Sequence, residues 1–240
     1  MLYLIGLGLD LKDISIRGIE AIAKCKKVYW ETYTNVYNYS QKEIEKTINA
    51  KVILADRKKV EEEKNEILEQ AKKEKVALLV SGDPLAATTH VDLMIRASKE
   101  KIKTEIIHAP SVFTAIAETG LQLYKFGKTA SIAKWSSSFR PDSFYDIIQN
   151  NLKNEAHTLL LIDIGLPISE ALTYLDSIAK ARDLGMLEKK IIICERLGTK
   201  EQNFTIGKIP VLMKLKFKLP SCIIIPGKLH FVEEDFIKGL

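Results

Sequence analysis

The carboxylate of Asp83, in the stretch 81–90 (SGDPLAATTH), is the side chain whose setting most favours a ligand-binding role. Gly82 lets the backbone approach another group closely, and the proline after Asp83 fixes the local turn. Together they hold one carboxylate in a defined direction at the start of a loop. The same residue types also suit a plain strand-to-helix turn in which Thr88 or Thr89 caps the following helix, so both interpretations stay open here.

The other residue types that perform catalysis lack partners at the required spacing. The four histidines are His90, His108, His157 and His230. None of them has a second ligand at helical spacing or a nearby cysteine, which argues against a metal site. There is no Gly-x-Ser-x-Gly elbow, and the carboxylates form no obvious acid–base pair. The sequence therefore gives no sign of a hydrolase, and it assigns no catalytic residue and no metal.

Gly6 and Gly8 follow a first apolar run and invite a nucleotide-binding interpretation, with Glu31 as a candidate for holding a ribose. However, the third glycine of the dinucleotide fingerprint is missing, and the next helix is expected only from Ser15. A phosphate-binding loop of the Gly-x-x-x-x-Gly-Lys type is also absent. The remaining signal is a set of loops rich in small residues with one aspartate. Such loops suit a compact, partly apolar cofactor that brings its own reactivity.

These loops are expected at the ends of strands that alternate with helices. Residues 76–80 (VALLV) are apolar without alternation, which is typical of a strand buried on both faces of a parallel sheet. Further strands are expected near 2–5, 28–30, 52–54, 102–107, 129–133, 158–163, 190–194, 204–206 and 222–225. Helices are expected from Ser15 and near 58–73, 89–100, 111–120, 144–152 and 169–182. The alternation runs in two successive blocks and predicts two α/β domains, residues 1–110 and 111–240.

Composition indicates a globular chain. The sequence has 240 residues, 46% of them apolar and 28% charged, with a formal net charge of +5. This charge is too small and too evenly spread to indicate nucleic-acid binding. The three cysteines are far apart, which favours a reducing cytoplasm over a disulfide framework. No apolar stretch approaches the roughly 18 residues of a membrane span, and no signal peptide is evident.

Five stretches together resemble the diphthine synthases, which belong to the tetrapyrrole methylase class of S-adenosylmethionine-dependent methyltransferases. They are residues 1–9 (MLYLIGLGL), 82–90 (GDPLAATTH), 108–111 (HAPS), 124–127 (YKFG) and 226–230 (PGKLH). The resemblance covers nearly the whole chain in order. It implies two α/β domains with S-adenosylmethionine in the cleft between them, and a homodimer. It also implies a protein substrate, translation elongation factor 2, methylated on the amine of a modified histidine in diphthamide biosynthesis.

The resemblance also implies which residues contact the cofactor. Carried over position by position, these contacts fall on Leu9, Asp83, Ala86, Ser111, Val112, Ile162, Leu197 and Cys222. Several of these contacts are expected through backbone groups, so the side-chain types vary. Two stretches depart from the family's pattern. The loop at 10–13 (DLKD) is one residue shorter, and residues 134–141 have little resemblance, so no role is assigned to them.

Two other functions remain to be weighed. A porphyrinoid methyltransferase of the cobalamin or siroheme branch would share the fold, but the stretches 124–127 and 226–230 argue against it. A non-catalytic module that binds nucleic acid or an acidic protein is favoured only by the net charge of +5. Failure to bind S-adenosylmethionine, together with salt-sensitive RNA binding, would favour that module.

Overall fold

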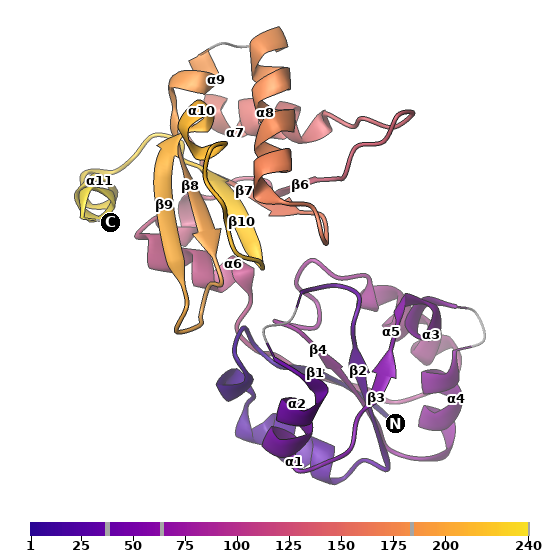
Figure 1. Cartoon of the computed structure of the whole chain (residues 1–240). Helices are drawn as coiled ribbons and strands as arrows, with labels where there is room; N and C mark the ends of the chain where they lie inside the picture. The colour runs from indigo at the N-terminus through magenta and orange to yellow at the C-terminus, as the bar shows by residue number, and fades with distance from the viewer. Residues whose placement is uncertain (37–38, 63–64, 183–184, 240) are drawn as a thin grey trace. The chain divides into compact units, whose positions relative to one another are not determined.

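Two units make up the chain, Met1–Ala115 and Ile116–Leu240, in the computed structural model (Figure 1). The model describes residues 1–36, 39–62, 65–182 and 185–239. Each unit has a sheet with helices packed on it, so the predicted fold class of two α/β domains is confirmed. The predicted boundary between residues 110 and 111 stays a prediction; the short helix α6 (Val112–Ala115) is grouped with the first unit.

The sheet of the first unit is parallel throughout its described pairs and has the order β3-β2-β4-β1-β5. Its strands are β1 (Leu2–Gly6), β2 (Lys27–Glu31), β3 (Ile53–Ala55), β4 (Val76–Val80) and β5 (Thr104–Ile107). All five residues of the central strand β4 are buried, as the apolar run predicted. The ends of β4, β1 and β5 therefore lie side by side at one edge of the sheet.

Helices cover both faces of this sheet. They are η1 (Leu11–Asp13), α1 (Ile16–Ala23), α2 (Gln41–Ile48), α3 (Arg57–Glu61), α4 (Glu66–Lys73), α5 (His90–Lys99) and α6. On one face α1 and α2 pack against alternate residues of the strands, including Ile5 and Leu79. On the other face α4 and α5 pack against the strand residues that point the opposite way, including Leu4 and Leu78. The alternation of strand side chains thus serves two apolar layers.

The helix expected over residues 58–73 is wrong as a single element. The structure has two helices, α3 and α4, because Asn65 begins a new one. The side-chain oxygen of Asn65 accepts hydrogen bonds from the N–H groups of Ile67 (2.9 Å) and Leu68 (3.2 Å). An asparagine in this position satisfies the free donors of a helix start. The helix predicted from Ser15 is confirmed, with the Ser15 hydroxyl accepting from the Gly18 N–H.

The sheet of the second unit has the order β6-β7-β10-β8-β9. Its strands are β6 (Ala130–Ile132), β7 (Thr158–Ile162), β8 (Lys190–Glu195), β9 (Asn203–Lys208) and β10 (Ser221–Ile225). Only β6 and β7 pair in parallel; the other described pairs are antiparallel. No described helix separates β8 from β9, and a short connection of this kind gives an antiparallel pair.

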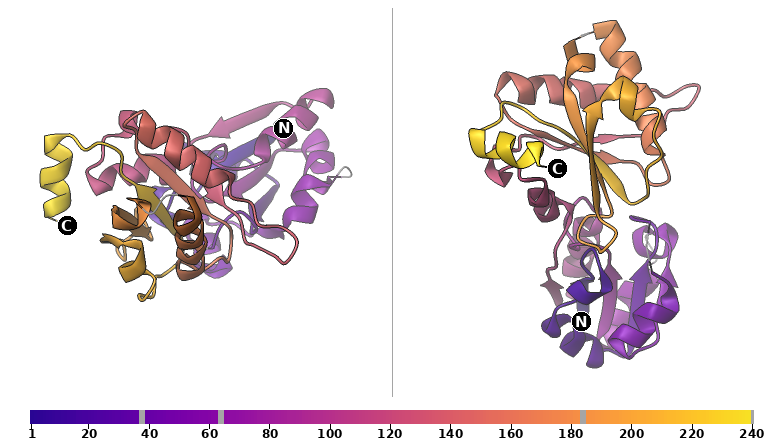
Figure 2. Two further views of the ribbon diagram at one scale, coloured as in Figure 1. Left: turned by 90° about the horizontal axis from the view of Figure 1, so that it is seen from above. Right: turned by 60° about the vertical axis from the view of Figure 1, so that its left-hand side comes forward.

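The second unit has seven described helices. They are η2 (Ile116–Thr119), η3 (Leu123–Lys125), α7 (Ser143–Lys153), α8 (Ile168–Arg182), α9 (Gly185–Glu188), α10 (Ile209–Leu212) and α11 (Phe231–Lys238). Of these, α7, α8, α9 and α10 pack with the sheet in one continuous apolar core. In every view α11, drawn in yellow, lies to the side of this unit's sheet (Figures 1 and 2). Among the described residues, none of the helices combines the length and apolar character needed to cross a membrane.

Candidate functional site

The first cluster of predicted site residues lies on the loops that follow β1, β4 and β5. Backbone hydrogen bonds join the first two loops, from the Gly82 N–H to the Gly8 oxygen (2.8 Å) and from the Gly8 N–H to the Gly82 oxygen (3.2 Å). A Cβ on Gly6 would lie 2.6 Å from the Gly82 oxygen and 2.7 Å from Ala109 Cβ. The three loops therefore approach so closely that position 6 requires glycine.

Asp83 connects two of these loops through its carboxylate. Oδ1 accepts a hydrogen bond from the Leu85 N–H (3.0 Å), which closes the turn after β4. Oδ2 lies 2.7 Å from Nδ1 of His108 and accepts from the Ala109 N–H (3.2 Å). A carboxylate offers about four acceptor directions, so one further donor could still bind. The Asp83 side chain keeps 14% exposure, which is compatible with a ligand at this position.

Neither threonine caps helix α5 with its side chain, so that expectation is wrong. Thr89 occupies the N-cap position, but its hydroxyl donates to Oε1 of Glu61 at 2.7 Å. The Thr88 hydroxyl donates instead to the Pro84 oxygen at 2.6 Å. Nδ1 of the buried His90 lies 3.0 Å from the same oxygen. The bonds of Thr88 and His90 fold the loop onto itself, whereas the bond of Thr89 ties the loop to the end of α3.

The other predicted residues of the first unit lie on the same three loops. Leu9 donates its N–H to Oδ2 of Asp13 at 2.9 Å, and the Ala86 N–H donates to the Asp83 backbone oxygen at 3.1 Å. Ser111 is buried, and its backbone oxygen accepts from the Ala115 N–H at 2.9 Å. Val112, half-buried, is the first residue of α6. The structure therefore brings five of the eight predicted residues to one edge of the first sheet: Leu9, Asp83, Ala86, Ser111 and Val112.

The remaining three predicted residues share one edge of the second unit's sheet. Ile162 ends β7, Leu197 follows the end of β8, and Cys222 lies near the start of β10. Because β10 runs antiparallel to β7 and β8, its start lies beside their ends, with Cys222 opposite both Leu161 and Cys194. Hydrogen bonding to Cys222 and burial raise the pKa of the Cys194 thiol. The Cys194 thiol is therefore protonated at neutral pH.

Glu31, considered above for holding a ribose, organises a turn instead. It is buried at the end of β2, and its Oε1 accepts from the N–H groups of Tyr33 (2.5 Å) and Thr34 (2.6 Å). The Thr34 hydroxyl donates to its other oxygen. Its lone pairs are thus occupied by its own loop, and a ribose would have to displace these bonds.

Sequence reasoning did not predict a buried ionic network that the second unit contains. The carboxylate of Glu233 accepts hydrogen bonds from the N–H groups of Gln122 (2.9 Å) and His230 (2.7 Å). It also contacts Lys125 Nζ and, at 3.1 Å, His157 Nε2. His157 Nδ1 in turn accepts from the Gly227 N–H at 2.9 Å. The network therefore joins the stretches 124–127 and 226–230, which are far apart in sequence.

Burial and hydrogen bonding oppose each other in this network. Burial alone would raise the pKa of Glu233, but the donors from His230, Lys125 and Gln122 outweigh it and lower that pKa to about 2. For His157, burial lowers the pKa more than the neighbouring carboxylate raises it, so the pKa lies below its usual value. Glu233 is thus charged and His157 neutral at pH 7. The pair attaches α11 to the segment that precedes β7.

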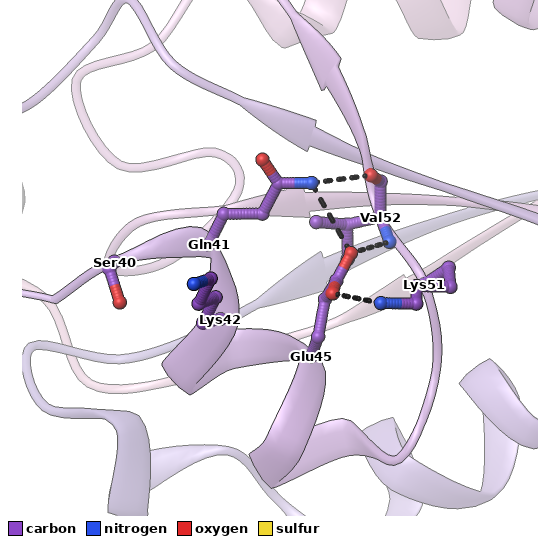
Figure 3. A pocket seen from close by; sticks show the side chains of 6 residues that line it. All are labelled: Ser40, Gln41, Lys42, Glu45, Lys51 and Val52. Atoms are coloured by element: carbon purple, nitrogen blue, oxygen red, sulfur yellow. Dashed lines mark hydrogen bonds and ion pairs between the residues drawn. The ribbon is translucent and has the colours of Figure 1, made fainter.

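An open depression on the first unit is lined by Ser40, Gln41, Lys42, Glu45, Lys51 and Val52 (Figure 3). Its polar groups bind one another. Glu45 accepts from Lys51 Nζ (2.8 Å), the Val52 N–H (3.1 Å) and Gln41 Nε2 (3.2 Å). Lys51 and Val52 precede β3, at the end of the parallel sheet opposite to the three loops. The depression therefore has a structural explanation and is not part of the candidate site.

Over residues 1–36, 39–62, 65–182 and 185–239, no group of three or more His, Cys, Asp or Glu side chains could hold a metal ion. The site instead consists of backbone-rich loops at strand ends with one carboxylate. Loops at the carboxyl ends of parallel strands are the usual place for a ligand in an open α/β sheet.

The fold and these loops define the class of protein. The family model described as Tetrapyrrole (Corrin/Porphyrin) Methylases matches residues 1–212, and the chain belongs to that family. Diphthine synthase of Methanococcus maripaludis is 41% identical over 251 residues, covering 100% of this chain and 98% of the relative. Diphthine methyl ester synthase of Saccharomyces cerevisiae is 41% identical over 264 residues, covering 99% of this chain and 88% of the relative.

Solved structures agree with these relatives. A crystal structure of diphthine synthase superimposes with a TM-score of 0.88 at 34% identity, covering 99% of this chain and 94% of that one. A structure from Entamoeba histolytica gives a TM-score of 0.92 at 36% identity, covering 100% and 97%. The resemblance identified from the five sequence stretches is thereby confirmed.

Proposed function

We propose that this chain uses S-adenosylmethionine to methylate the modified histidine of translation elongation factor 2, the diphthine synthase step of diphthamide biosynthesis. The observation that carries the proposal is the relationship to diphthine synthases along the whole chain, at 41% identity to the relative from M. maripaludis. The porphyrinoid alternative would share the fold, but neither of these full-length relatives bears the name of such an enzyme. A binding module without activity is not favoured either, because the family is one of methylases.

We assign the cofactor to the eight residues named above. Leu9, Asp83, Ala86, Ser111 and Val112 would contribute from the first unit. The chemistry of this set fits: small side chains and backbone groups can follow a nucleoside, and Asp83 can accept from a hydroxyl or amine. Ile162, Leu197 and Cys222 would contribute apolar surface from the second unit. When bound, S-adenosylmethionine supplies an activated methyl group on a sulfonium.

The chain's own task is then positioning rather than bond-making. Alignment of a donor and an acceptor in line can supply several kcal/mol of the barrier reduction, on the order of 7–11 kcal/mol in favourable cases. The accepting amine must be neutral to attack. His108 is held by Asp83, and no residue of the cluster is assigned as a general base. Water or the substrate itself would take the proton.

The names of the relatives differ in the product that they state. The relative from M. maripaludis is named diphthine synthase, whereas the yeast relative is named diphthine methyl ester synthase. We propose the amine as the acceptor in this chain. The test is transfer of a labelled methyl group from S-adenosylmethionine into elongation factor 2 that carries the unmethylated intermediate, followed by mild alkali. Label on nitrogen survives alkali, whereas a methyl ester is hydrolysed. Complete loss of label in alkali would replace the amine by a carboxylate as the acceptor.

We further infer that the protein is a homodimer and acts in the cytoplasm without nucleic acid or membrane as a partner. The three cysteines, Cys25, Cys194 and Cys222, are free thiols, as expected in a reducing compartment. The dimer rests on the resemblance alone.

A further inference from the structure

The loop between β6 and α7 projects from the body of the second unit and passes beside α8 (Figure 1). We call residues 134–141 the arm. It leaves the sheet at the end of β6, which pairs in parallel with β7 and places Ile132 opposite Ile162. The arm therefore begins at the strand ends where one of the proposed cofactor residues lies.

The base of the arm is rigidly held. The Trp135 ring stacks on Tyr174 of α8 with 4.1 Å between centroids and 6° between the planes. Trp135 also donates from its backbone N–H to Tyr174 Oη (3.3 Å) and from Nε1 to the Pro141 oxygen (3.1 Å). The bond from Trp135 to Pro141 joins the beginning of the arm to its end. An aromatic pair of this kind adds stability beyond its buried area.

Asp163 connects the arm to the loop after β7. Its Oδ2 accepts from the Lys134 N–H at 3.2 Å, and its Oδ1 accepts from the Ile164 N–H at 2.9 Å. The Asp163 N–H donates to the Ile132 oxygen at 3.0 Å. The position of the arm is thus tied to the residue that follows Ile162.

The tip of the arm is ordered by its own hydrogen bonds. The Ser136 N–H donates to the Phe139 oxygen at 2.9 Å, and the Phe139 N–H donates to Ser136 Oγ at 3.1 Å. The Arg140 guanidinium lies 5.9 Å from the Trp135 ring centroid, within the range of a cation–π contact. The result is a fixed turn that presents the Phe139 side chain with 60% exposure.

We propose that the arm docks the protein substrate of the proposed methyl transfer, with Phe139 inserted into an apolar hollow on that protein. The proposal rests on the proposed function and adds the surface through which the substrate is held. A convex tip does not suit a porphyrinoid, because small ligands are bound in concave pockets. A pre-ordered aromatic side chain on a projecting turn suits a protein, since such anchors dominate protein interfaces and lose little entropy on binding.

The positive charge of the arm indicates that its partner carries acidic groups. Lys134 and Arg140 are the ionisable side chains of the arm, and both are basic. The rim of the hollow that receives Phe139 is therefore expected to be acidic. A second copy of this chain is the other conceivable occupant, and it becomes an outcome of the test below.

The test compares Phe139→Ala and Phe139→Leu with Phe231→Ala, a control that removes a similarly exposed phenylalanine (69%) from α11. Methyl transfer is measured against the concentration of elongation factor 2, with cofactor affinity and Tm on the same samples. We expect Phe139→Ala to raise KM for the protein about tenfold, the loss of one interface anchor. The leucine variant should lie between it and the wild type. Cofactor affinity, Tm and the control should not change.

The outcomes separate this inference from the proposed function. If the wild type transfers no methyl group to the protein, the proposed function fails and the arm's role with it. If the wild type is active and Phe139→Ala has the same KM, only the arm's role is overturned. A lowered Tm with weaker cofactor binding would make Phe139 structural, and a halved mass in light scattering would make the arm a contact between copies. Both results overturn the inference.

Discussion

At the residue scale, Asp83 has the turn role that the sequence left open, and it remains the proposed cofactor carboxylate. Its carboxylate closes the turn after β4 and also contacts His108 and Ala109, so it is a structural residue as well as the candidate cofactor carboxylate. The sequence predicted its direction from the flanking glycine and proline. It could not predict the pairing with His108, because the two residues are 25 positions apart and meet only when β4 and β5 flank β1.

Replacing Asp83 should therefore affect both stability and binding. Asp83→Ala removes three hydrogen bonds, and at about 1 kcal/mol each the free energy of unfolding should fall by about 1–3 kcal/mol. S-adenosylmethionine affinity should fall by roughly 10- to 100-fold, since a charge-assisted bond contributes about 1.5–3 kcal/mol. Asp83→Asn keeps one acceptor oxygen and should lose less of both. Urea denaturation and calorimetry on the same variants measure the two effects.

If Asp83 only stabilises the turn and does not bind the cofactor, stability and cofactor affinity should respond differently to its replacement. In that case Asp83→Ala would lower stability while the affinity for S-adenosylmethionine stays at the wild-type value. Such a result would remove Asp83 from the cofactor site and leave it as a turn residue.

The cysteine thiols should be unreactive in the folded protein. Burial raises the pKa of Cys25 to about 11, and Cys194 and Cys222 are buried. Because the thiolate is the nucleophile, a disulfide reagent at pH 7 should label almost no thiol before unfolding and all three after it. Rapid labelling of Cys222 in the native state, located by mass spectrometry, would show that its edge of the sheet opens to solvent.

At the element scale, the Glu233 network holds α11 against the segment 122–125. Removing one partner of a buried ion pair is strongly destabilising, so Glu233→Gln should lower the free energy of unfolding by about 3 kcal/mol. The control is Glu155→Gln, which breaks an exposed pair with Lys228 and should cost under about 1 kcal/mol. Equal effects of the two variants would show that the network contributes no more than a surface pair.

The same network predicts how stability depends on pH. The pKa values of both His157 and Glu233 are lower in the folded state, so the unfolded chain binds more protons in acid. Stability should therefore be fully present at pH 7 and should fall below pH 6.5 as the unfolded histidine is protonated. It should fall again between about 4.5 and 2 through Glu233. Urea midpoints should show a shallower decline between about pH 4.5 and 2 in Glu233→Gln, because that variant lacks the carboxylate; an unchanged slope there would contradict the assignment.

Elements with strong local signals were predictable, and those set by distant contacts were not. The apolar run of β4 and the serine cap of α1 both appear where expected. The break between α3 and α4 depends on one asparagine that resembles any other polar residue of a charged helix. The ordered conformation of the arm was not predictable, because it depends on Trp135 stacking on Tyr174, 39 positions away in sequence.

At the scale of the whole molecule, the alternation of strands and helices predicted two α/β units correctly. It could not reveal that β8, β9 and β10 pair antiparallel, because strand direction depends on which strands become neighbours. The five sequence stretches predicted the family. Their occurrence together and in a fixed order is specific to that family, whereas a single stretch would not be. The division of the chain between two units also means that the eight predicted cofactor residues belong to two clusters.

Cofactor binding and assembly are expected properties of the whole chain. Calorimetry should show about one S-adenosylmethionine site per chain with an affinity in the micromolar range, roughly 8 kcal/mol. Light scattering should give twice the mass of one chain. An absence of heat and of thermal stabilisation at millimolar ligand would count against the cofactor, and a monomer mass would count against the dimer.

The most direct measurement offers the protein two acceptors side by side with labelled S-adenosylmethionine: elongation factor 2 with the unmethylated intermediate, and a porphyrinoid precursor. We predict label on the modified histidine of the elongation factor and none on the porphyrinoid. Label on the porphyrinoid alone would contradict the assignment while keeping the fold and the cofactor.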